Sequence, residues 1–429
     1  MRQLTKRVIP ASLFLELRPY GHVVEAVLYN LRYGFPARGM KVIGVTGTNG
    51  KTTTSLLIHA MLTEAGLKTG VMTTALYGVG KDLKPSDSHM TTLPIPLLMK
   101  RLVAFRKAGV EWLVLETSSH ALDQHRVWGV PYSVAVWTNL THEHLDYHKT
   151  FENYRTAKVR LFKLAAKNRK GLRTGVVNAD DMSWKYFAAA VPNVVTYGIE
   201  HGDLRATDIT LTARGSDFVA QYQGRKLQVH IHLPGMFNVS NALAAVGVGV
   251  TAGLTDEQII RGLATLPGVS GRMERIDEGQ DFDLFVDFAV TPDAMEQALK
   301  TLRATTKGRV MIVFGATGDR EKTKRPVMGE IAASLADMVY LTDDETYTEN
   351  PETIRHMVRE GVMKANGGNK LREIPDRMEA IKAAFADAKK GDAILLTGMG
   401  HFRTRNMGGK EIEWDERQIA KKLLRMNVF

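Results

Sequence analysis

The stretch that decides the fold is Gly44-Val-Thr-Gly-Thr-Asn-Gly-Lys-Thr52, which lies between an apolar strand-like run and a helix-like segment. Strand, glycine-rich turn and helix in this order are typical of a phosphate-binding loop, because backbone N–H groups and the helix N-terminus attract an anion. We expect Lys51 to reach nucleotide phosphates and Thr52 to bind Mg²⁺. The spacing is the short G-x-x-G-K-T form that begins at Gly47, because position 45 is a valine.

Outside this loop, short apolar strands and amphipathic helices alternate through most of the chain. Residues 111–117, 132–140 and 174–179 read as further strands, and residues 152–167 read as a helix between the last two. This order is typical of a parallel sheet that is covered by helices. Short alternating segments between about 195 and 232 interrupt the order and predict a small antiparallel insertion.

A linker-like segment, Leu266-Pro-Gly-Val-Ser-Gly-Arg272, divides the chain. We predict one α/β domain at 41–268, which carries the loop, and a second at 269–429, where a new series of strands and helices begins. A basic helical lead at 1–40 precedes both domains. The predicted fold class is therefore α/β, with two domains behind a short helical segment.

Composition excludes several classes of protein. With 44% hydrophobic and 24% charged residues among 429, the chain is not broadly disordered. The absence of cysteine excludes disulfides, thiolate metal sites and cysteine nucleophiles. The net charge of +11 favours an anionic partner, such as a phosphorylated substrate, a membrane surface or nucleic acid. No apolar run reaches the roughly 18 residues of a spanning helix, so we expect a soluble, cytoplasmic protein.

The lead is unusually basic, because residues 1–51 contain eight Lys or Arg and two Glu. Apolar residues from Val23 to Leu31 recur at helical spacing, and Gly34 and Pro36 close the run. Two interpretations stay open. The helix packs on the following domain, or it makes a peripheral membrane or protein contact, since basic residues flank it.

Two further groups of polar residues follow predicted strands. Glu116 lies at the end of a buried strand, and open α/β sheets bind ligands at that edge, so we expect a metal-binding carboxylate. The loop after the next strand carries His142, His144 and His148. Three histidines are compatible with zinc. We favour one histidine assisting Mg²⁺, because the loop offers no fourth soft ligand; a purely solvated loop is the other alternative.

Seven motifs together resemble the Mur ligase family, which builds the peptide of peptidoglycan. In that family's order they are GVTGTNGKTT, ETSSHALDQHRV, VWTNLTHEHLDYHKTFENYRTAK, GMFNVSNALAAV, GVSGRMERID, DFAVTPDAM and GATGDREKTKRPVMG. The resemblance covers nearly everything from Val42 to the C-terminus and is strongest to members that add the third residue of the stem peptide. It implies a central P-loop ATPase domain and a C-terminal Rossmann-like domain that closes over the site.

The resemblance also implies roles for individual residues. ATP and a first Mg²⁺ would be held by Gly47, Thr48, Asn49, Gly50, Lys51, Thr52 and Thr53. A second Mg²⁺ would be held by Glu116, His144 and Lys158, the last carbamylated as in such enzymes. Positions at the adenine, the hinge and the ribose match Asn238, Asn241, Arg272 and Asp287. Positions that grip the muramoyl-peptide match Thr91, Thr92, Ser119, Gln124 and Arg126.

Two departures from the family pattern concern the acceptor and the nucleotide. Family members carry a full UDP-binding domain where this sequence has about 40 residues, so we expect the acceptor to be held differently. The usual DYAHTPD motif reads Asp287-Phe-Ala-Val-Thr-Pro-Asp293, with Val290 in place of histidine. Because Asp287 remains, we expect nucleotide binding to survive.

A third departure concerns the incoming amino acid. Members that add diaminopimelate carry a DNPR motif, and here Tyr347 stands at the position of its arginine. The later GKGHE-type motif reads GMGHF at 398–402, without its Lys and Glu. We therefore do not expect diaminopimelate. Asp344 and Glu345 either attract a second ammonium, as on lysine or ornithine, or cap the helix that begins near Pro351.

The leading hypothesis is an ATP-dependent ligase that adds an amino acid to the carboxylate of a muramoyl-peptide. Phosphorylation makes the carboxylate an acyl phosphate, which an amine then attacks, so the protein mainly positions groups and neutralises charge. Two alternatives remain: the same chemistry on a non-UDP acceptor, as in folylpolyglutamate synthetases, or a non-catalytic nucleotide-binding scaffold. No nucleic-acid recognition motif accompanies the basic surplus, so we expect small-molecule substrates only.

Overall fold

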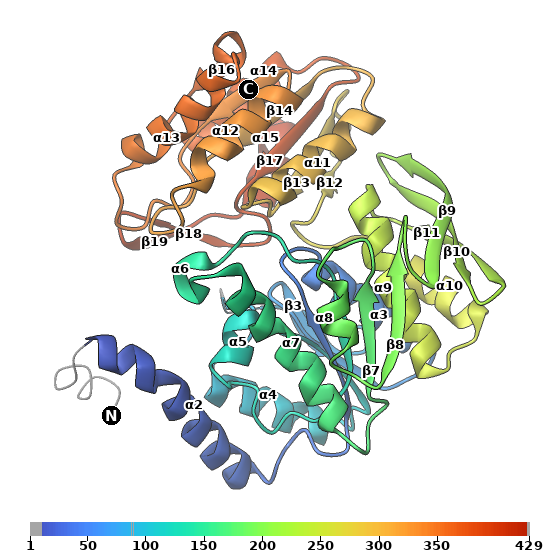
Figure 1. The fold of residues 1–429 in the computed structure, drawn as a ribbon. Coiled ribbons are helices and arrows are strands. Elements are labelled where there is room, and N and C mark those ends of the chain that lie inside the picture. Colours follow the sequence, from blue (N-terminus) through green and yellow to red (C-terminus); the bar gives the residue numbers. More distant parts are fainter. Residues whose placement is uncertain (1–10, 87, 89, 427–429) are drawn as a thin grey trace. The chain divides into compact units, whose positions relative to one another are not determined.

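The computed structural model describes residues 11–426 except 87 and 89, so the first ten residues of the predicted lead lie outside the described residues (Figure 1). The chain forms two compact units. The first takes in the chain up to Thr207, with Val219–Val229 and Ser240–Thr265. The second takes in Asp208–Phe218, His230–Val239 and Leu266–Phe429. No helix in the described part of the chain is both long and apolar enough to cross a membrane.

The larger sheet has eleven strands in the order β11-β10-β9-β8-β7-β6-β1-β5-β2-β3-β4. These strands are β1 (Lys41–Thr46), β2 (Thr69–Met72), β3 (Leu76–Val79), β4 (Asp82–Pro85), β5 (Trp112–Glu116), β6 (Tyr132–Trp137), β7 (Thr174–Asn178), β8 (Asn193–Gly198), β9 (Leu204–Thr212), β10 (Gly215–Tyr222) and β11 (Arg225–Ile231). The predicted parallel α/β sheet is confirmed, since β1, β2, β5, β6, β7 and β8 pair in parallel.

Helices cover both faces of this sheet. They are α2 (Ala11–Tyr33), α3 (Lys51–Glu64), α4 (Ile95–Lys107), α5 (Ser119–Asp123), α6 (Leu145–His148), α7 (Phe151–Lys167), α8 (Trp184–Ala188), α9 (Met236–Ala252) and α10 (Asp256–Ala264). Strand β7 shows the two faces in adjacent residues. A Cβ at Gly175 would meet Phe162 of α7 at 2.7 Å, whereas a Cβ at Gly247 of α9 would meet Val176 at 2.9 Å. Side chains alternate along a strand, so α7 and α9 lie on opposite faces.

Three neighbouring strands end at the same level of the sheet, and this level positions the site. Val45 of β1 is opposite Glu116 of β5 and Val136 of β6. The chain leaves β1 into the glycine-rich turn and leaves β6 through Thr138. The carboxyl ends of parallel strands therefore bring the turn, the carboxylate and the loop after β6 to one edge, as the sequence predicted.

Two parts of this sheet differ from the sequence prediction. The three strands predicted between about 195 and 232 are present as β9, β10 and β11, joined by connections of two residues. They are not a separate insertion, because they extend the main sheet through β8, which pairs in parallel with both β7 and β9. The hairpin of β3 and β4 was not predicted at all. Its strands have only four residues each and no regular apolar alternation, so the periodicity signal is weak.

The second unit contains a six-stranded sheet in the order β12-β13-β17-β14-β15-β16 and a hairpin of β18 and β19. The strands are β12 (Glu274–Ile276), β13 (Asp283–Asp287), β14 (Val310–Phe314), β15 (Met338–Leu341), β16 (Leu371–Glu373), β17 (Ala393–Thr397), β18 (Thr404–Met407) and β19 (Lys410–Glu413). The helices are α11 (Pro292–Thr305), α12 (Lys324–Leu335), α13 (Pro351–Lys364), α14 (Arg377–Asp387) and α15 (Glu416–Met426), with the short η1 (Gly368–Lys370). Alternate strand residues pack with α11–α13 and with α14–α15, so this sheet is also covered on both faces.

The predicted helix in the lead is present as α2 and begins at Ala11, twelve residues before Val23, the first apolar residue of the spacing that indicated it. Its C-terminal half packs against the first unit, because Ala26 belongs to the same buried cluster as Leu98 and Leu102 of α4. The interpretation that the lead packs on the following domain is thus confirmed for this half. The opposite face of the helix is described below.

Candidate active site

The glycine-rich turn has the backbone of a tight anion-binding loop. Gly47 has φ +155° and Gly50 has φ +82°, and any side chain there would collide with neighbours. A Cβ would lie 1.8 Å from Thr138 Oγ1 at Gly47 and 2.3 Å from Asn241 Oδ1 at Gly50. Only glycine fits at either position without a collision, and the turn can therefore keep this tight backbone.

The end of β6 holds the turn in place. Asn139 Oδ1 accepts the N–H of Asn49 at 2.9 Å, and the N–H of Thr48 donates to Asn139 O at 3.0 Å. Thr138 Oγ1 donates to Asn49 O at 2.6 Å. These contacts over about 90 residues of sequence fix Thr48 and Asn49, while Thr53 is buried in the first turn of α3.

Two lysines meet at Gly47. Lys51 Nζ donates to the carbonyls of Gly47 at 3.1 Å and Thr48 at 2.7 Å, and Lys158 Nζ donates to Gly47 O at 2.6 Å. Lys158 is almost completely buried within α7. Burial and then the charge of Lys51 lower the pKa of Lys158 well below its ordinary value. Sequence reasoning without the family would place this lysine on an exposed helix face.

The carboxylate of Glu116 receives three hydrogen bonds on one oxygen. Oε2 accepts from Thr52 Oγ1 at 3.0 Å, from Thr74 N at 2.8 Å and from Thr74 Oγ1 at 3.1 Å. Glu116 is buried at the end of β5. The structure therefore joins the two residues predicted to bind metal, Thr52 and Glu116, and adds Thr74, which sequence reasoning missed.

The histidine loop forms an aromatic cluster beside α7. The ring centroid of His144 lies 4.7 Å from that of His120 and 6.0 Å from that of Tyr154. His148 Nε2 lies 3.0 Å from Ser119 Oγ. Burial lowers the pKa of His120 and of His148 to about 4 and also lowers the pKa of His144. Neutral imidazoles are the form that ligates metals.

His142 does not join this cluster, because its ring lies over Phe151, with 5.1 Å between centroids. Within the described residues there is no group of three or more His, Asp or Glu side chains arranged to hold a metal ion. The zinc interpretation of the three histidines therefore has no support from the geometry.

Tyr154 connects the loop, Lys158 and the histidines, although the sequence offered no reason to choose it. Its hydroxyl lies 3.2 Å from Thr48 Oγ1, and Lys158 Nζ lies 4.4 Å from its ring centroid. The tyrosine is almost fully buried, and burial raises the pKa of its hydroxyl. Its position four residues before Lys158 on α7 is the one signal that could have indicated it, since such residues share a helix face.

The residues predicted to grip the acceptor lie together near the end of β5. Arg126 Nη1 donates to Thr92 O, and Thr92 Oγ1 donates to Glu116 O at 3.1 Å. Gln124 Nε2 donates to Tyr147 OH at 3.2 Å. Thr92, Ser119, Gln124 and Arg126 are buried, while Thr91 is half-buried.

The two asparagines of α9 have separate surroundings. Asn241 Oδ1 accepts from Thr54 Oγ1 at 3.2 Å and lies against Gly50, so it contacts the loop helix directly. Asn238 Nδ2 donates to Pro234 O at 2.8 Å, four residues earlier. The structure thus brings Asn241 to the glycine-rich turn within the first unit.

In the second unit, Arg272 and Asp287 are neighbours. Asp287 Oδ2 accepts from the N–H of Met273 at 2.6 Å, and the Arg272 guanidinium lies 4.6 Å from the ring centroid of Phe288. Burial raises the pKa of Asp287 to about 6, and the nearby charge of Arg272 opposes this shift. In its ionised form this carboxylate can accept a hydrogen bond from a hydroxyl, as the predicted ribose contact requires.

Asp344 and Glu345 are buried in the loop after β15. Asp344 Oδ1 accepts from Glu345 N at 2.9 Å, and Glu345 Oε1 accepts from Asn406 N at 3.0 Å. Tyr347 OH donates to Glu345 Oε2 at 3.4 Å. Burial raises the pKa of Asp344. The loop and β18 are thereby tied together.

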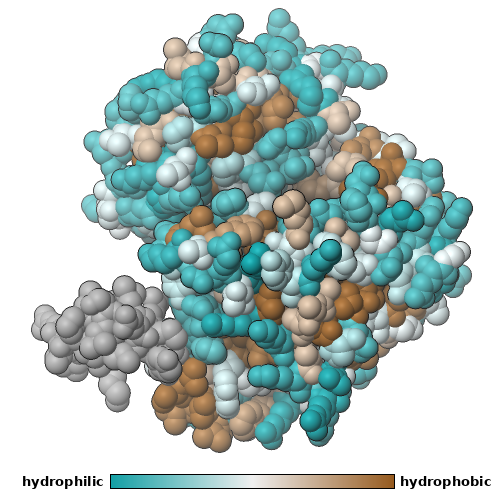
Figure 2. All heavy atoms as spheres, in the orientation of Figure 1, coloured by the Kyte–Doolittle hydropathy of each residue, from teal (hydrophilic) through white to brown (hydrophobic). Residues whose placement is uncertain are grey.

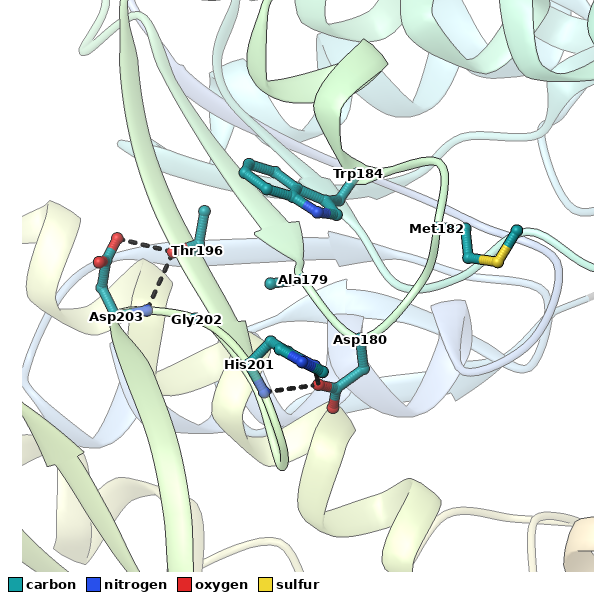
Figure 3. Close-up of a pocket in the computed structure, with 8 residues that line it drawn as sticks. All are labelled: Ala179, Asp180, Met182, Trp184, Thr196, His201, Gly202 and Asp203. Atoms are coloured by element: carbon teal, nitrogen blue, oxygen red, sulfur yellow. Dashed lines mark hydrogen bonds and ion pairs between the residues drawn. The ribbon is translucent and has the colours of Figure 1, made fainter.

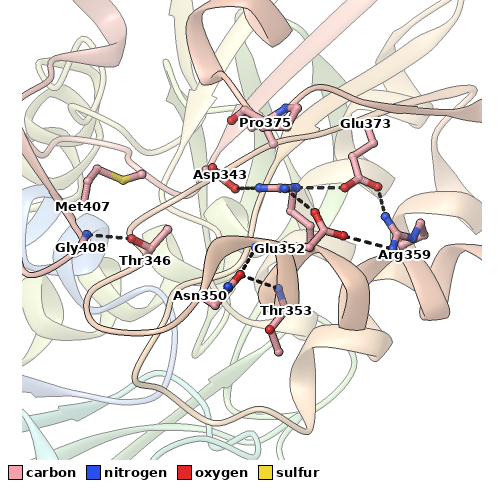
Figure 4. Close-up of polar contacts among 12 residues, drawn as sticks. Asp343, Thr346, Asn350, Glu352, Thr353, Arg359, Glu373, Pro375, Met407 and Gly408 are labelled. Carbon is pink, nitrogen blue, oxygen red and sulfur yellow. Dashed lines mark hydrogen bonds and ion pairs between the residues drawn. The ribbon is translucent and has the colours of Figure 1, made fainter.

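The alternative that these two carboxylates cap α13 is wrong. The cap is Asn350, whose Oδ1 accepts from the N–H groups of Glu352 at 2.8 Å and Thr353 at 3.3 Å (Figure 4). Asn350 immediately precedes Pro351, the usual place for a cap, and the carboxylates lie five or six residues too early. A guanidinium also lies near this loop: Arg320 is 5.2 Å from the ring centroid of Tyr347.

A cavity of about 510 Å³ lies away from all these residues (Figure 3). It opens where β7 and β8 end, and its lining includes Asp180, Trp184 and His201. Asp180 accepts the backbone N–H groups of Ile199 at 2.6 Å and His201 at 2.8 Å. These bonds make the carboxylate part of the loop structure, and no predicted site residue lines the cavity.

The parallel sheet, the G-x-x-G-K-T turn and the buried carboxylate bound to the loop threonine define a P-loop nucleotide-dependent enzyme. Comparison with models of known protein families identifies the family within this class. The model of the Mur ligase middle domain matches residues 45–249, and that of the Mur ligase glutamate ligase domain matches residues 271–400. The chain belongs to the Mur ligase family, whose members are ATP-dependent ligases of peptidoglycan precursor synthesis.

Several relatives match over most of their length. A UDP-N-acetylmuramoyl-L-alanyl-D-glutamate–2,6-diaminopimelate ligase of Clostridium acetobutylicum is 39% identical over 409 residues, which is 94% of this chain and 82% of the relative. A UDP-N-acetylmuramyl-tripeptide synthetase of Roseiflexus is also 39% identical, over 95% of this chain and 82% of the relative.

Solved structures show the same fold. One UDP-N-acetylmuramoyl-L-alanyl-D-glutamate–2,6-diaminopimelate ligase matches with a TM-score of 0.64 and 33% identity, over 92% of this chain and 80% of that one. The folylpolyglutamate synthase of Mycobacterium tuberculosis matches with a TM-score of 0.73 over 90% of this chain and 94% of that one. At 19% identity the second likeness concerns the fold alone.

Proposed function

We propose that this ligase adds an amino acid to a muramoyl-peptide carboxylate, at the third position of the stem peptide. The observation that carries the proposal is the convergence of Lys51, Lys158, Thr52 and Glu116 around one glycine-rich turn. The names of the full-length relatives, which are muramoyl-dipeptide ligases, support the acceptor class. The cytoplasmic location expected from the sequence stays a prediction.

The residues around the turn fit ATP with Mg²⁺. Hard oxygen donors suit Mg²⁺, and the hydroxyl of Thr52 and a carboxylate oxygen of Glu116 lie 3.0 Å apart at the start of α3. Bound Mg²⁺ would neutralise charge on the phosphates. Thr52 and Glu116 would hold this ion. His144 and carbamylated Lys158 would join Glu116 as ligands of a second Mg²⁺. Lys51 folds back on the turn and reaches two of its carbonyls, so it is long enough to meet phosphate there.

Carbamylation of Lys158 is part of the proposal. Carbon dioxide reacts with a neutral amine, and burial beside Lys51 favours the neutral form of Lys158. Addition of CO₂ to the neutral amine would form a new N–C bond, release one proton and give an anion that balances the charge of Lys51. The ring of Tyr154 and the carbonyl of Gly47 would hold the modified side chain in place.

The incoming amino acid is proposed to carry a second ammonium and no distal carboxylate. Tyr347 supplies no charge where relatives with DNPR have arginine, and Glu345 accepts hydrogen bonds at the same loop. Attraction of an ammonium is the interpretation of Asp344 and Glu345 that we propose, although Glu345 also ties the loop to β18 through Asn406. Arg320 is the nearby cation that could serve diaminopimelate instead.

One experiment tests acceptor and amino acid together. The chain is incubated with ATP, Mg²⁺ and muramoyl-dipeptides with and without UDP, and with lysine, ornithine, diaminopimelate or all other amino acids in turn. Phosphate release and product mass are measured. Lysine or ornithine should give the highest kcat/KM. A preference for diaminopimelate that Arg320→Ala abolishes would overturn the amino-acid assignment, and no product with any amino acid would overturn the function.

A further inference from the structure

Helix α2 is anchored to the first unit by one face. Ala26 is completely buried, and the buried Asn30 donates from Nδ2 to the carbonyl of Trp128 at 3.0 Å. Beyond the helix, Arg106 of α4 donates to the carbonyls of Tyr33 at 3.2 Å and Gly34 at 3.1 Å. These bonds satisfy carbonyls at the helix C-terminus, so the C-terminal half of α2 is a fixed part of the unit.

The opposite face of the same half is apolar and exposed. Val24, Leu28 and Leu31 are 58%, 59% and 62% exposed. Spacings of four and three residues place them in one stripe along the helix. Figure 2 shows a hydrophobic patch at the lower left, where this part of α2 lies in Figure 1. A surface helix normally turns polar residues outward, so this stripe indicates an apolar environment beyond the chain.

Cations surround the C-terminal end of the stripe. Arg32, Arg38, Arg106 and Lys107 are all exposed. The Arg38 guanidinium lies 4.0 Å from the ring centroid of Phe35. Trp128 is exposed, and its ring centroid lies 6.3 Å from that of Phe35. Aromatic and cationic groups thus lie at the C-terminal end of the helix that carries the apolar stripe.

Glu25 is the one acidic residue between Gly21 and Met40, and it is half-buried with Oε2 3.4 Å from His22 Nδ1. In this stretch the exposed charged side chains, Arg32 and Arg38, are therefore both cationic. An apolar stripe with such cations at its end complements phosphate headgroups above an apolar phase.

We propose that the outer face of α2 binds an anionic lipid surface, with the helix in the plane of the interface. Val24, Leu28 and Leu31 enter the acyl boundary, while Arg32 and Arg38 meet lipid phosphates. The contact is peripheral and leaves the glycine-rich turn free. It is independent of the proposed ligase reaction, and each can fail without the other.

The test is co-sedimentation of the full chain with vesicles of phosphatidylcholine, alone or with about 30% phosphatidylglycerol. The chain should bind the anionic vesicles, and Leu28→Glu with Leu31→Glu should weaken binding about tenfold or more. Arg32→Gln with Arg38→Gln should weaken it by about fivefold or more. High salt should weaken it as well. The matched control is Met363→Glu on α13, where a methionine of 56% exposure lies in the second unit.

Thermal melting and ATP-dependent phosphate release show that each variant folds, since none of these residues belongs to the site. Absence of binding to anionic vesicles overturns the proposal. Equal binding by the double leucine variant and the parent chain also overturns it. Light scattering after gel filtration measures whether the chain is a monomer or a dimer. A parent dimer that Leu28→Glu with Leu31→Glu converts to a monomer would assign the face to a second copy of the chain instead.

Discussion

Lys158 donates a hydrogen bond of 2.6 Å to the carbonyl of Gly47, which is 111 residues earlier and begins the glycine-rich turn. Lys51 donates to the same carbonyl at 3.1 Å. Two amines that share one acceptor repel each other when both are charged, and burial adds to the cost for Lys158. This arrangement explains why one of the pair should be neutral or modified in the active enzyme.

Replacement of Lys158 by alanine should lower kcat by about 100-fold or more, because a buried group beside the phosphates is lost. KM for the amino acid should change little, since Lys158 lies in the first unit. Removal of dissolved CO₂ should also lower the activity of the parent chain, and bicarbonate should restore it. Lys163→Ala, which removes an exposed lysine from the same helix, is the control. Full activity of Lys158→Ala would contradict the assignment.

Glu116→Gln should weaken the binding of Mg²⁺, because an amide is a poorer ligand than a carboxylate. The Mg²⁺ concentration for half-maximal phosphate release should rise about tenfold or more. Thr52→Ser retains the hydroxyl that lies 3.0 Å from Glu116 and should stay near the parent value, whereas Thr52→Val should behave like Glu116→Gln. Identical titrations for all three variants would exclude this pair as the metal site.

Gly50→Ala should reduce ATP affinity by about tenfold or more, because the new Cβ would lie 2.3 Å from Asn241 Oδ1. Gly66→Ala is a matched control. Both glycines have similar positive φ, +82° and +85°, but nothing lies within 4 Å of a Cβ at Gly66. The control should lose only about 1 kcal/mol of unfolding free energy through backbone strain. ATP titration by calorimetry separates the two effects, and equal losses of affinity would contradict the steric argument.

His59 should make the protein less stable as pH falls below neutrality. Burial in α3 lowers its pKa from 6.5 to about 4, and its Nε2 has no hydrogen-bond partner. The unfolded chain therefore binds a proton more readily than the folded chain between these two values. This group's stabilising contribution is complete above pH 6.5 and declines by up to about 1.4 kcal/mol per pH unit down to pH 4.

Denaturant unfolding across this range tests the His59 prediction. His59→Gln should flatten the pH dependence relative to the parent chain, whatever it does to stability at neutral pH. His201→Gln, at an exposed histidine in the first unit, should leave the slope unchanged. Parallel curves for the parent and His59→Gln would show that the buried imidazole is not responsible.

Glu349→Gln should destabilise the second unit by about 3 kcal/mol at neutral pH, because it leaves the fully buried Arg325 without its anion. Arg325 donates from Nη1 to Glu349 Oε2 and from Nη2 to Glu349 Oε1, each at 2.9 Å. Bonding to Arg325 lowers the pKa of Glu349 from 4.5 to about 2, so the stabilisation is present above pH 4.5 and disappears towards pH 2. Glu352→Gln, at a mostly exposed carboxylate, should destabilise the protein far less than Glu349→Gln.

Those parts of the fold with strong local signals could be predicted. The run from Lys41 to Glu64 shows apolar strand, glycine-rich turn and helix in sequence, and each appears with nearly the expected bounds. The hairpin of β3 and β4 could not be predicted, because four-residue strands give too few positions for a period of two to be visible. The parallel pairing of β8 and β9 was missed because only five residues separate the two strands, and so short a connection normally joins antiparallel strands.

Residues close together in the chain were enough to predict the nucleotide loop, its lysine and threonine, the family and the alternation of strands and helices in the two parallel sheets. The contacts between Glu116 and Thr52, the approach of Lys158 and Tyr154 to the loop, and the cap of α13 by Asn350 became visible only in three dimensions. The tertiary structure also decided that α2 packs by one apolar face and exposes another. Burial and long-range contact set these features, and neither is a property of a local stretch of sequence.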